Sequence, residues 1–480
     1  MSLRVRSSAG GVSPLSILRI KPRRVESDKR VLCRAHGAAD DKTDFIRSYQ
    51  RARRSLSMNV VFVDTTMTTP PTGGAHTFLV SVCASLVEQG HHVSVVGEPG
   101  PDAAIPTAIQ RAGSDVLMNL WSRRHLPEER AYRLAAWVNR ERADVYIISV
   151  SPDAGWLALP LLDPSIVTMS IAHADGPAFY EPLKHYAPFI DCAVGVSKAI
   201  HKRIVDQCSV PPARAHHVPY GVTSLSPPEI AARRARRVEP DEPLRIGYLG
   251  RLVQGHKRVL DLVPLAKELD RRGIPFELHL LGDGPERLAL ESGFEKSGVT
   301  RHVKFWGWLT REAIRQRLRE LDALVLLSDS EGLPLALLES MGHGVVPVVT
   351  NLEGGLTEVV KEGENGFLVA VGDIGKFVNR FELLAGDRER LSLMRQAAWE
   401  SSQDYSLERM VQWYVQTFQE AAARTIERKQ RDGLTSQYPV MPSCRSKYPF
   451  WLRKIKSRVL SIGSPNSSTT AAMSVLAGSS

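Results

Sequence analysis

The second half of the chain alternates short apolar runs with helical stretches, and this alternation restricts the possible fold more than any other feature. Five runs have the length and composition of buried strands: RIGYLG (245–250), FELHLLG (276–282), HVKFWG (302–307), ALVLLS (323–328) and VVPVVT (345–350). Stretches with helical periodicity separate them, near residues 257–270, 286–297, 310–319 and 335–342. Strands that alternate with helices of this length predict a doubly wound parallel sheet, because parallel strands need a crossover connection.

The first half carries a second series of the same kind. It begins with the apolar run NVVFVD (59–64), a helical pattern over 76–89 and a further strand, HVSVVG (92–97). Later apolar runs are DVYIISV (144–150), IVTMSIAH (166–173) and CAVGVS (192–197). A strand–helix–strand unit at this spacing again predicts a parallel sheet, so we expect an α/β chain with two Rossmann-like domains.

Composition divides the chain into six segments. The stretch between the two series holds four prolines around a cluster of arginines, which is typical of a linker. We predict a disordered extension (1–57), an N-terminal Rossmann-like domain (58–225), a linker (226–243), a C-terminal Rossmann-like domain (244–405), a helix (406–426) and a basic, mostly disordered tail (427–480).

The basic charge of the chain lies in its two terminal segments. The formal net charge is +10, of which residues 1–57 contribute +9 and residues 427–480 contribute +7, leaving −6 for residues 58–426. A fold that binds nucleic acid carries its basic surface on the folded domain. We therefore expect no nucleic-acid partner.

Cysteine usage and hydropathy predict a soluble, cytoplasmic protein. The 5 cysteines are scattered and form no C-x-x-C pair, which argues against a disulfide framework and a zinc site. No apolar run approaches the roughly 20 residues that span a bilayer, and the N-terminus lacks the pattern of a secretory signal. One segment, YPFWLRKIKSRVL (448–460), would be basic and amphipathic as a helix. Two interpretations stay open for residues 445–460: a weak contact with a membrane surface, or a solvated tail.

Charged and small residues cluster in the loops that follow the strands of the second series. In chain order they are Arg251, Lys257, Glu331, Glu339, Gly354 and Gly355. Ligands of doubly wound sheets bind at the carboxyl ends of the strands, so we expect these residues to face one cleft. Arginine and lysine suit a diphosphate, carboxylates accept hydrogen bonds from sugar hydroxyls, and glycine lets the backbone approach a ligand closely. The combination predicts a site for a nucleotide-diphosphate sugar.

Four motifs in fixed order identify a family resemblance. They are G-R-L…K, G-D-G-P, E-G-L-P-x4-E with the following SMGHGVVPVV, and G-G-x-x-E, all within residues 245–370. This set resembles the large family of retaining group 1 glycosyltransferases, the Glu-x7-Glu type with GT-B architecture, and the resemblance extends over residues 58–425. It implies two Rossmann-like domains that face a cleft, with the acceptor domain first and the donor-binding domain second.

The resemblance implies a role for each matching residue. Arg251 and Lys257 would bind the donor diphosphate and stabilise the departing phosphate. Glu331 would hold the donor sugar through its hydroxyls, and Glu339 would hold the ribose of the nucleotide. His173 would contact the donor sugar from across the cleft. Further donor-binding positions are Gly73, Gly74, Gly250, Gly332, Leu333, Pro334, Gly354 and Gly355.

The resemblance also implies a reaction. A hexosyl group would pass from a nucleotide-diphosphate sugar, the co-substrate, to a glycan, a lipid-linked or a small-molecule acceptor. The acceptor would attack from the leaving-group side without an enzyme nucleophile, and the donor phosphate would take its proton. We expect no permanently bound cofactor and no metal, because the chain contains no D-x-D pair of the kind that holds a metal in other glycosyltransferases.

Other functions fit the same fold. A nucleotide-sugar epimerase or hydrolase would act on the donor without an acceptor, and a non-catalytic protein would only bind it. The intact set of charged loop residues favours transfer over both. A Rossmann dehydrogenase is less favoured, because no G-x-G-x-x-G follows the first strand of either series.

Overall fold

The computed structural model describes residues 57–64, 74–97, 104–118, 120–121, 125–151, 153–235 and 242–425. Apart from Ser57, the predicted N-terminal extension lies outside these residues. The predicted C-terminal tail, with its segment 445–460, lies outside them as well.

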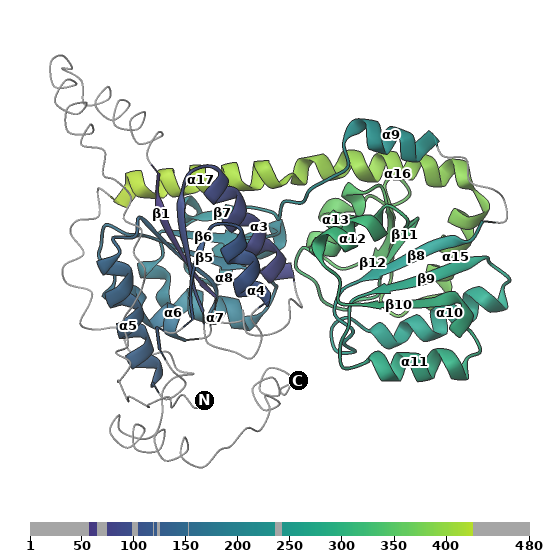
Figure 1. Ribbon diagram of the computed structural model, residues 1–480, viewed down its shortest axis with the longest axis horizontal. Coiled ribbons are helices and arrows are strands. Elements are labelled where there is room, and N and C mark those ends of the chain that lie inside the picture. The colour runs from purple at the N-terminus through teal and green to yellow at the C-terminus, as the bar shows by residue number, and fades with distance from the viewer. Residues whose placement is uncertain are drawn as a thin grey trace, which may run out of the picture. The chain divides into compact units, whose positions relative to one another are not determined.

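Two parallel sheets form the framework, one in each half of the chain (Figure 1). The first has the order β3-β2-β1-β4-β5-β6-β7 and the second the order β10-β9-β8-β11-β12-β13. The first sheet contains β1 (Asn59–Asp64), β2 (His92–Val96), β3 (Asp115–Leu117), β4 (Val145–Val150), β5 (Val167–Ala172), β6 (Cys192–Gly195) and β7 (Ala215–His217). The second contains β8 (Leu244–Leu249), β9 (Phe276–Leu281), β10 (Val303–Gly307), β11 (Ala323–Leu326), β12 (Val346–Thr350) and β13 (Phe367–Val369).

The strand order reverses beside the first strand of each sheet, between β1 and β4 and between β8 and β11. This is the doubly wound topology, which opens a crevice at the carboxyl ends of the strands at the reversal. The two Rossmann-like domains predicted from the apolar runs are therefore confirmed. The central strands are mostly apolar, with Val60 to Val63 fully buried, because helices cover both faces of a parallel sheet.

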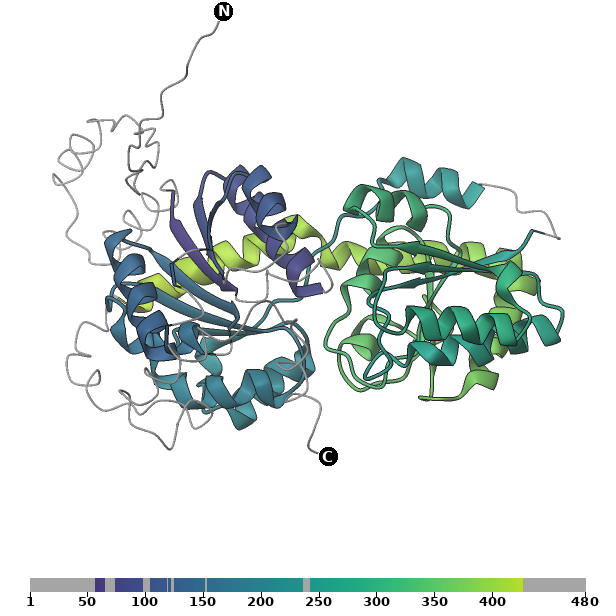
Figure 2. The same ribbon diagram turned by 60° about the horizontal axis from the view of Figure 1, so that its bottom comes forward.

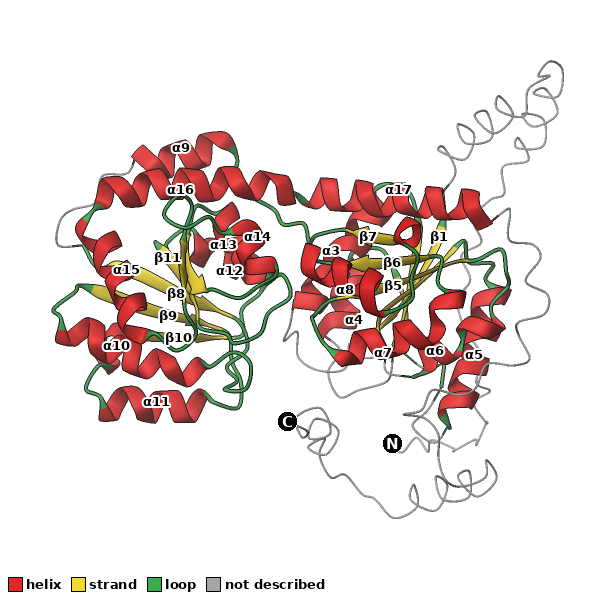
Figure 3. Ribbon diagram, turned by 180° about the vertical axis from the view of Figure 1, so that it is seen from behind, coloured by secondary structure: helices red, strands yellow, loops and turns green. Residues whose placement is uncertain are grey.

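The helices that accompany the sheets are coloured red in Figure 3. Those of the first domain are α3 (Gly74–Glu88), α4 (Ala104–Arg111), α5 (Pro127–Arg140), α6 (Ala154–Leu157), α7 (Pro177–Tyr186) and α8 (Lys198–Gln207). Those of the second domain are α10 (Leu262–Arg271), α11 (Arg287–Lys296), α12 (Arg311–Leu318), α13 (Leu335–Gly342), α14 (Gly355–Val359), α15 (Ile374–Gly386) and α16 (Arg388–Ser402). Within the described residues, no helix is both long and apolar enough to cross a bilayer.

The segment predicted as a linker, residues 226–243, contains a helix, α9 (Pro227–Ala235). Its two leading prolines suggested a loop, but proline is tolerated in the first turn of a helix, where its missing N–H has no partner to lose. Ile230 is buried, and α9 packs against α16 of the second domain. A helix with an anchored apolar side chain thus occupies half of the expected linker.

The last helix, α17 (Leu407–Thr425), returns to the first domain (Figure 2). It packs on α3 and β5, and the chain that leads into it pairs with Val222 through a bridge at Ser406. Its apolar side chains repeat at helical spacing, and four of them are almost completely buried: Met410, Val411, Tyr414 and Phe418. The C-terminal end of the described chain therefore completes the core of the N-terminal domain.

Candidate active site

The loop after β8 begins with a glycine that the local packing requires. Gly250 has a φ of +152°, and its carbonyl lies so close to Gly282, after β9, that a Cβ there would come within 1.9 Å of it. No larger residue fits at Gly282 without moving the backbone. The close approach of these two glycines shapes the start of the loop that carries Arg251 and Lys257.

Lys257 and Glu331 form an ion pair between the loops that follow β8 and β11. Lys257 Nζ lies 2.6 Å from Glu331 Oε1, and Ser328 donates its hydroxyl to the same oxygen at 2.6 Å. The two charged side chains are 22% and 8% exposed. Among the described residues, Glu331 Oε2 has no hydrogen-bond partner. The crevice between the first and fourth strands of this sheet thus holds a cation and a carboxylate oxygen that a ligand can use.

Arg251 belongs to the same group of charges. Its backbone carbonyl accepts a hydrogen bond of 2.8 Å from the Tyr248 hydroxyl. The charge of its guanidinium is close enough to His256 to lower the pKa of that ring. Burial and, next, the charge of Lys257 lower the pKa of His256, and Arg251 adds to this effect. The structure therefore brings Arg251, Lys257 and Glu331 to one end of the sheet.

The E-G-L-P segment packs closely against its surroundings through glycine. A Cβ on Gly332 would lie 2.9 Å from the carbonyl oxygen of His173, in the first domain. Gly355 donates its N–H to the Gly332 carbonyl at 3.0 Å, and a Cβ on Gly355 would lie only 2.0 Å from that oxygen. Gly354, which precedes α14, has a φ of +128°. Close backbone contact thus favours glycine at positions 332 and 355, and the positive φ favours glycine at position 354.

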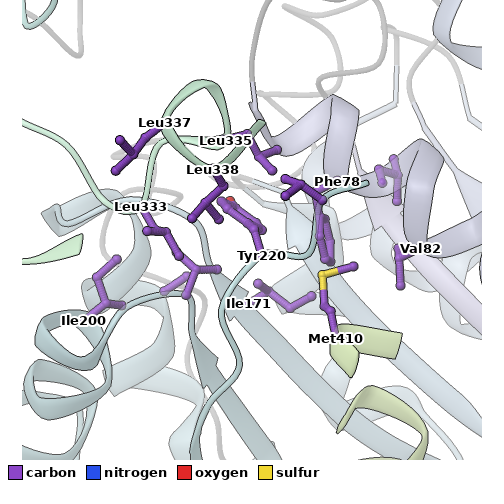
Figure 4. Close-up of a cluster of buried hydrophobic side chains, with 14 of the residues drawn as sticks. Phe78, Val82, Ile171, Ile200, Tyr220, Leu333, Leu335, Leu337, Leu338 and Met410 are labelled. Carbon is purple, nitrogen blue, oxygen red and sulfur yellow. The ribbon is translucent and has the colours of Figure 1, made fainter. Parts of the chain in front are cut away.

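Apolar side chains next to this segment join the two domains. Leu333 is buried and Pro334 precedes the first turn of α13. Figure 4 shows Leu333, Leu335 and Leu338 beside Tyr220 and Phe78 of the first domain, in one buried cluster. Gly74, the first residue of α3, lies against Leu335 at 3.4 Å, measured from an added Cβ. Gly73 lies outside the described residues.

Glu339 lies apart from the Lys257–Glu331 pair. It lines a small pocket between α3, α12, α13 and residues 221–223, and none of Arg251, Lys257 and Glu331 lines that pocket. Burial raises the pKa of Glu339, while Arg311 and Arg315 of α12 oppose this effect. Arg311 donates to Ser81 Oγ and to the Thr77 carbonyl of α3. A carboxylate flanked by two guanidinium groups in a partly closed pocket can accept hydrogen bonds from a vicinal diol.

The ring of His173 is held on both sides in the first domain. Nε2 lies 3.0 Å from Ser149 Oγ, and Nδ1 lies 2.6 Å from the Tyr220 hydroxyl. Ser149 donates to Asp64 Oδ2 at 3.1 Å. Burial and, less strongly, the nearby His76 lower the pKa of His173 to about 3. These contacts place His173 at the carboxyl end of β5, beside the ends of β1 and β4.

Several residues of the site were not identified from the sequence. Asp64, Ser149 and Tyr220 come from separate segments, and only the acidic residue at the end of an apolar strand gave a local signal. Glu358, the last residue of G-G-x-x-E, accepts the N–H of Ala199 at 3.2 Å and so lies at the first turn of α8. The motif contained Glu358, but only its glycines were given a role. In the described part of the chain, no three His, Cys, Asp or Glu side chains are grouped so as to hold a metal ion.

Two family models match this chain one after the other. Residues 72–224 match the model described as Glycosyltransferase Family 4, and residues 229–400 match the one described as Glycosyl transferases group 1. The boundary between the matches falls beside the start of α9.

Curated relatives are similar over part of their length. The lipopolysaccharide 1,6-galactosyltransferase of Salmonella typhimurium is 33% identical over 143 residues, 29% of this chain and 39% of that protein. The sulfoquinovosyl transferase SQD2 of Arabidopsis thaliana is 32% identical over 175 residues, 35% of this chain and 31% of that protein. The chain thus spans less than two thirds of the length of these relatives.

Solved structures share the fold. Anabaena HepE in complex with UDP and glucose superposes with a TM-score of 0.60 at 18% identity, over 76% of this chain and 100% of that one. A mutant of S. aureus TarM in complex with Fondaparinux, alpha-GlcNAc-glycerol and UDP gives a TM-score of 0.61 at 12% identity, over 75% and 99% of the two chains. At identities this low the likeness shows the fold alone, which is the GT-B architecture.

Proposed function

We propose that this chain, which belongs to the group 1 glycosyltransferases of GT-B architecture, transfers a hexosyl group from a nucleotide-diphosphate sugar to an acceptor. The observation that carries this proposal is the Lys257–Glu331 pair at the carboxyl ends of β8 and β11. A diphosphate would form an ion pair with Lys257 in place of Glu331. The Glu331 carboxylate would then be available to accept hydrogen bonds from the sugar hydroxyls.

Each charged residue has a place in this proposal. Arg251 and Lys257 bind the diphosphate and stabilise the negative charge that develops on the leaving phosphate. Glu331 orients the sugar, with Oε2 available for a hydroxyl donor. Glu339 accepts hydrogen bonds from the ribose of the nucleotide in its own pocket.

We further propose that transfer proceeds with retention at the anomeric carbon and without a metal ion. The acceptor attacks from the leaving-group side and the donor phosphate takes its proton. The similar lipopolysaccharide galactosyltransferase supports a glycan acceptor, and a lipid-linked or small-molecule acceptor is the alternative. Contact of residues 445–460 with a membrane surface stays a prediction, as does a cytoplasmic location.

A thermal-shift screen with UDP, GDP, ADP and their common sugar conjugates tests the donor. A ligand that binds the folded protein alone raises the melting temperature by mass action, so we expect one nucleotide and its sugar to stand out. Incubation with that donor and candidate acceptors, with and without EDTA, then tests transfer, and NMR coupling at the anomeric proton reports its stereochemistry. Conversion of the donor to an altered free sugar nucleotide without an acceptor would identify an epimerase or hydrolase instead.

A further inference from the structure

Helix α8 of the first domain receives part of its N-terminal cap from the second domain. The first turn of a helix leaves backbone N–H groups without an intrahelical acceptor. In α8, Ser197 Oγ accepts the N–H of Ile200 at 3.2 Å, as an N-cap serine commonly does. Ala199 donates its N–H instead to Glu358 Oε1 at 3.2 Å, and Glu358 belongs to α14, 159 residues further along the chain. One carboxylate thus joins the two domains at this helix end.

The surroundings of the Glu358 carboxylate suit this contact. Its side chain is only 13% exposed, so solvent screens its charge incompletely. A negative charge is stabilising at a helix N-terminus, where the helix dipole is positive. His217, at the end of β7, is a second neighbour, with Nε2 at 3.9 Å from Glu358 Oε2. Burial lowers the pKa of His217, so at pH 7 this ring is neutral and the hydrogen bond to α8 is the directed contact.

The first turn of α8 also lies against two loops of the proposed donor site. A Cβ on Gly354, in the G-G-x-x-E segment, would lie 3.7 Å from Ala199 Cβ. A Cβ on Gly332, in the E-G-L-P segment, would lie 3.4 Å from Ile200 Cδ1. Ile200 is fully buried, and Figure 4 shows it in the cluster that holds Leu333. This turn of α8 therefore contacts the loop after β11 and the loop after β12 at once.

The hydrogen bond of Glu358 gives these apolar contacts a defined position. Apolar contact has no preferred direction, whereas a hydrogen bond fixes both a distance and an angle. Glu358 lies three residues after Gly355 in the short helix α14, and the N–H of Gly355 bonds to the Gly332 carbonyl at 3.0 Å. Gly332 directly follows Glu331, the proposed ligand of the donor sugar. A chain of direct contacts thus connects the cap of α8 with that carboxylate.

We propose that Glu358 is a positioning residue of the donor site. Its carboxylate joins α14 to the N-terminus of α8, and so holds the G-G-x-x-E and E-G-L-P segments at a fixed place against the first domain. It acts through these segments and not on the donor itself. The inference rests on the proposed function for its link to the donor.

Amide hydrogen exchange of the nucleotide-free protein tests the cap. Glu358→Ala removes the acceptor of the Ala199 N–H, so exchange at that amide should accelerate about three- to thirtyfold, the usual effect of losing a helix cap. Glu358→Gln keeps an oxygen that can accept, and should restore most of the protection. Glu362→Ala is the matched control, because Glu362 accepts the N–H of Leu368 at 2.6 Å within the second domain. Unchanged exchange at Ala199 in Glu358→Ala would overturn the inference.

Donor affinity tests the positioning role. At a temperature at which every variant is folded, Glu358→Ala should bind the sugar nucleotide selected by the thermal-shift screen about three- to thirtyfold more weakly. Glu358→Gln should recover most of this affinity, and Glu362→Ala should bind as the wild type does. Wild-type affinity in Glu358→Ala would overturn the inference, whether or not its melting temperature falls. If the wild type binds no nucleotide, the proposed function fails and the link to the donor fails with it, whereas the exchange result still decides whether Glu358 joins the two domains.

Discussion

Lys257 is the residue on which the proposed chemistry depends most directly. Its ammonium group is compact and mobile, and it is paired with Glu331 at 2.6 Å in a site that is mostly closed to water. A departing nucleoside diphosphate gains negative charge in the transition state, and a cation that is already in place stabilises this charge without reorganisation.

Lys257→Ala should therefore lower kcat by about 10² to 10³, equivalent to about 3–4 kcal/mol of transition-state stabilisation. Steady-state kinetics at saturating donor measures the effect. Lys304→Ala is the matched control, because Lys304 forms a comparable pair with Glu277 at 2.9 Å outside the site. Near-wild-type turnover of Lys257→Ala would remove Lys257 from the proposed role.

The buried ring of His173 predicts a dependence of stability on pH. Its pKa falls from 6.5 to about 3 on folding, because burial and then His76 disfavour the charged form. Above pH 6.5 both the folded and the unfolded chain hold the ring neutral, so the full stability is present. Below pH 6.5 the unfolded chain binds a proton at this ring, and the folded chain does not. The free energy of unfolding therefore falls by about 1.4 kcal/mol for each pH unit until the folded pKa is reached.

His173→Gln lacks this titration. Its melting temperature should lie below that of the wild type at pH 7.5, and the gap should narrow as the pH falls to 5.5. Differential scanning fluorimetry of both proteins across this range measures the gap. His302→Gln serves as a control, since His302 lies at the rim of the second sheet beside Asp270. A constant gap would mean that folding leaves the pKa of the His173 ring unchanged, and a gap that widens with acid would mean that folding raises this pKa.

At the scale of single elements, the helix pair that frames the E-G-L-P segment depends on two glycines in backbone contact. A Cβ on Gly355 would lie 2.0 Å from the Gly332 carbonyl, a distance that no real contact tolerates. The first turn of α14 would have to move away from the loop before α13. The carboxylate of Glu331 lies one residue before Gly332, so its position would change too.

Gly355→Ala should consequently lose donor binding while the chain remains folded. Titration with the sugar nucleotide from the screen measures the loss, and circular dichroism checks the fold. Gly386→Ala is a suitable control, because an added Cβ there meets no atom within 4 Å and Gly386 ends α15. Unchanged affinity in Gly355→Ala would mean that the close contact is not required for the site.

The strands could be predicted where an apolar run fills the whole element. The cores of β1, β4, β5, β8 and β12 follow such runs, since strands buried on both faces leave few polar positions. The three-residue strands β3, β7 and β13 could not be predicted, because they are too short to show a period and β7 ends in two histidines. Helix α9 could not be predicted, because in the sequence alone its leading prolines indicate a turn.

Some residues of the candidate site could likewise be predicted from the sequence, and others could not. Lys257 and Glu331 belong to motifs in loops whose place in a doubly wound sheet follows from the topology, so their meeting could be expected. The hydrogen bonds of His173 could not be expected, because its partners Tyr220 and Ser149 lie 47 and 24 residues away, and Asp64, which accepts from Ser149, is further away still. No periodicity links Asp64, Ser149 and Tyr220; only the tertiary packing of β1, β4 and β5 brings them together. No sequence motif marks Arg311, and only its contacts with Ser81 and Thr77 place it at the pocket of Glu339.

At the scale of the whole molecule, α17 makes the N-terminal domain depend on the C-terminal end of the described chain. Gly221 N–H lies 3.1 Å from Met410 Sδ, and the ring of Tyr414 lies 5.7 Å from that of Phe78 in α3. Phe418 is fully buried and packs beside Tyr414, with ring centroids 6.1 Å apart. The first domain therefore cannot complete its core until the second has been synthesised and α17 has docked.

Phe418→Ala should destabilise the protein by about 3–5 kcal/mol, the usual cost of removing a buried phenylalanine, although Phe418 is far in sequence from the domain it supports. The effect should appear in the first domain: amide hydrogen exchange should accelerate in α3 and β5, which α17 covers, and stay unchanged in β9 and α10. Gln412→Ala, an exposed position of the same helix, controls for helix propensity and should leave exchange unchanged. Faster exchange confined to β9 and α10 would contradict the docking of α17 on the first domain. A uniform increase would mean that the two domains unfold as one unit, because loss of the α17 contacts would then lower the stability of both sheets equally.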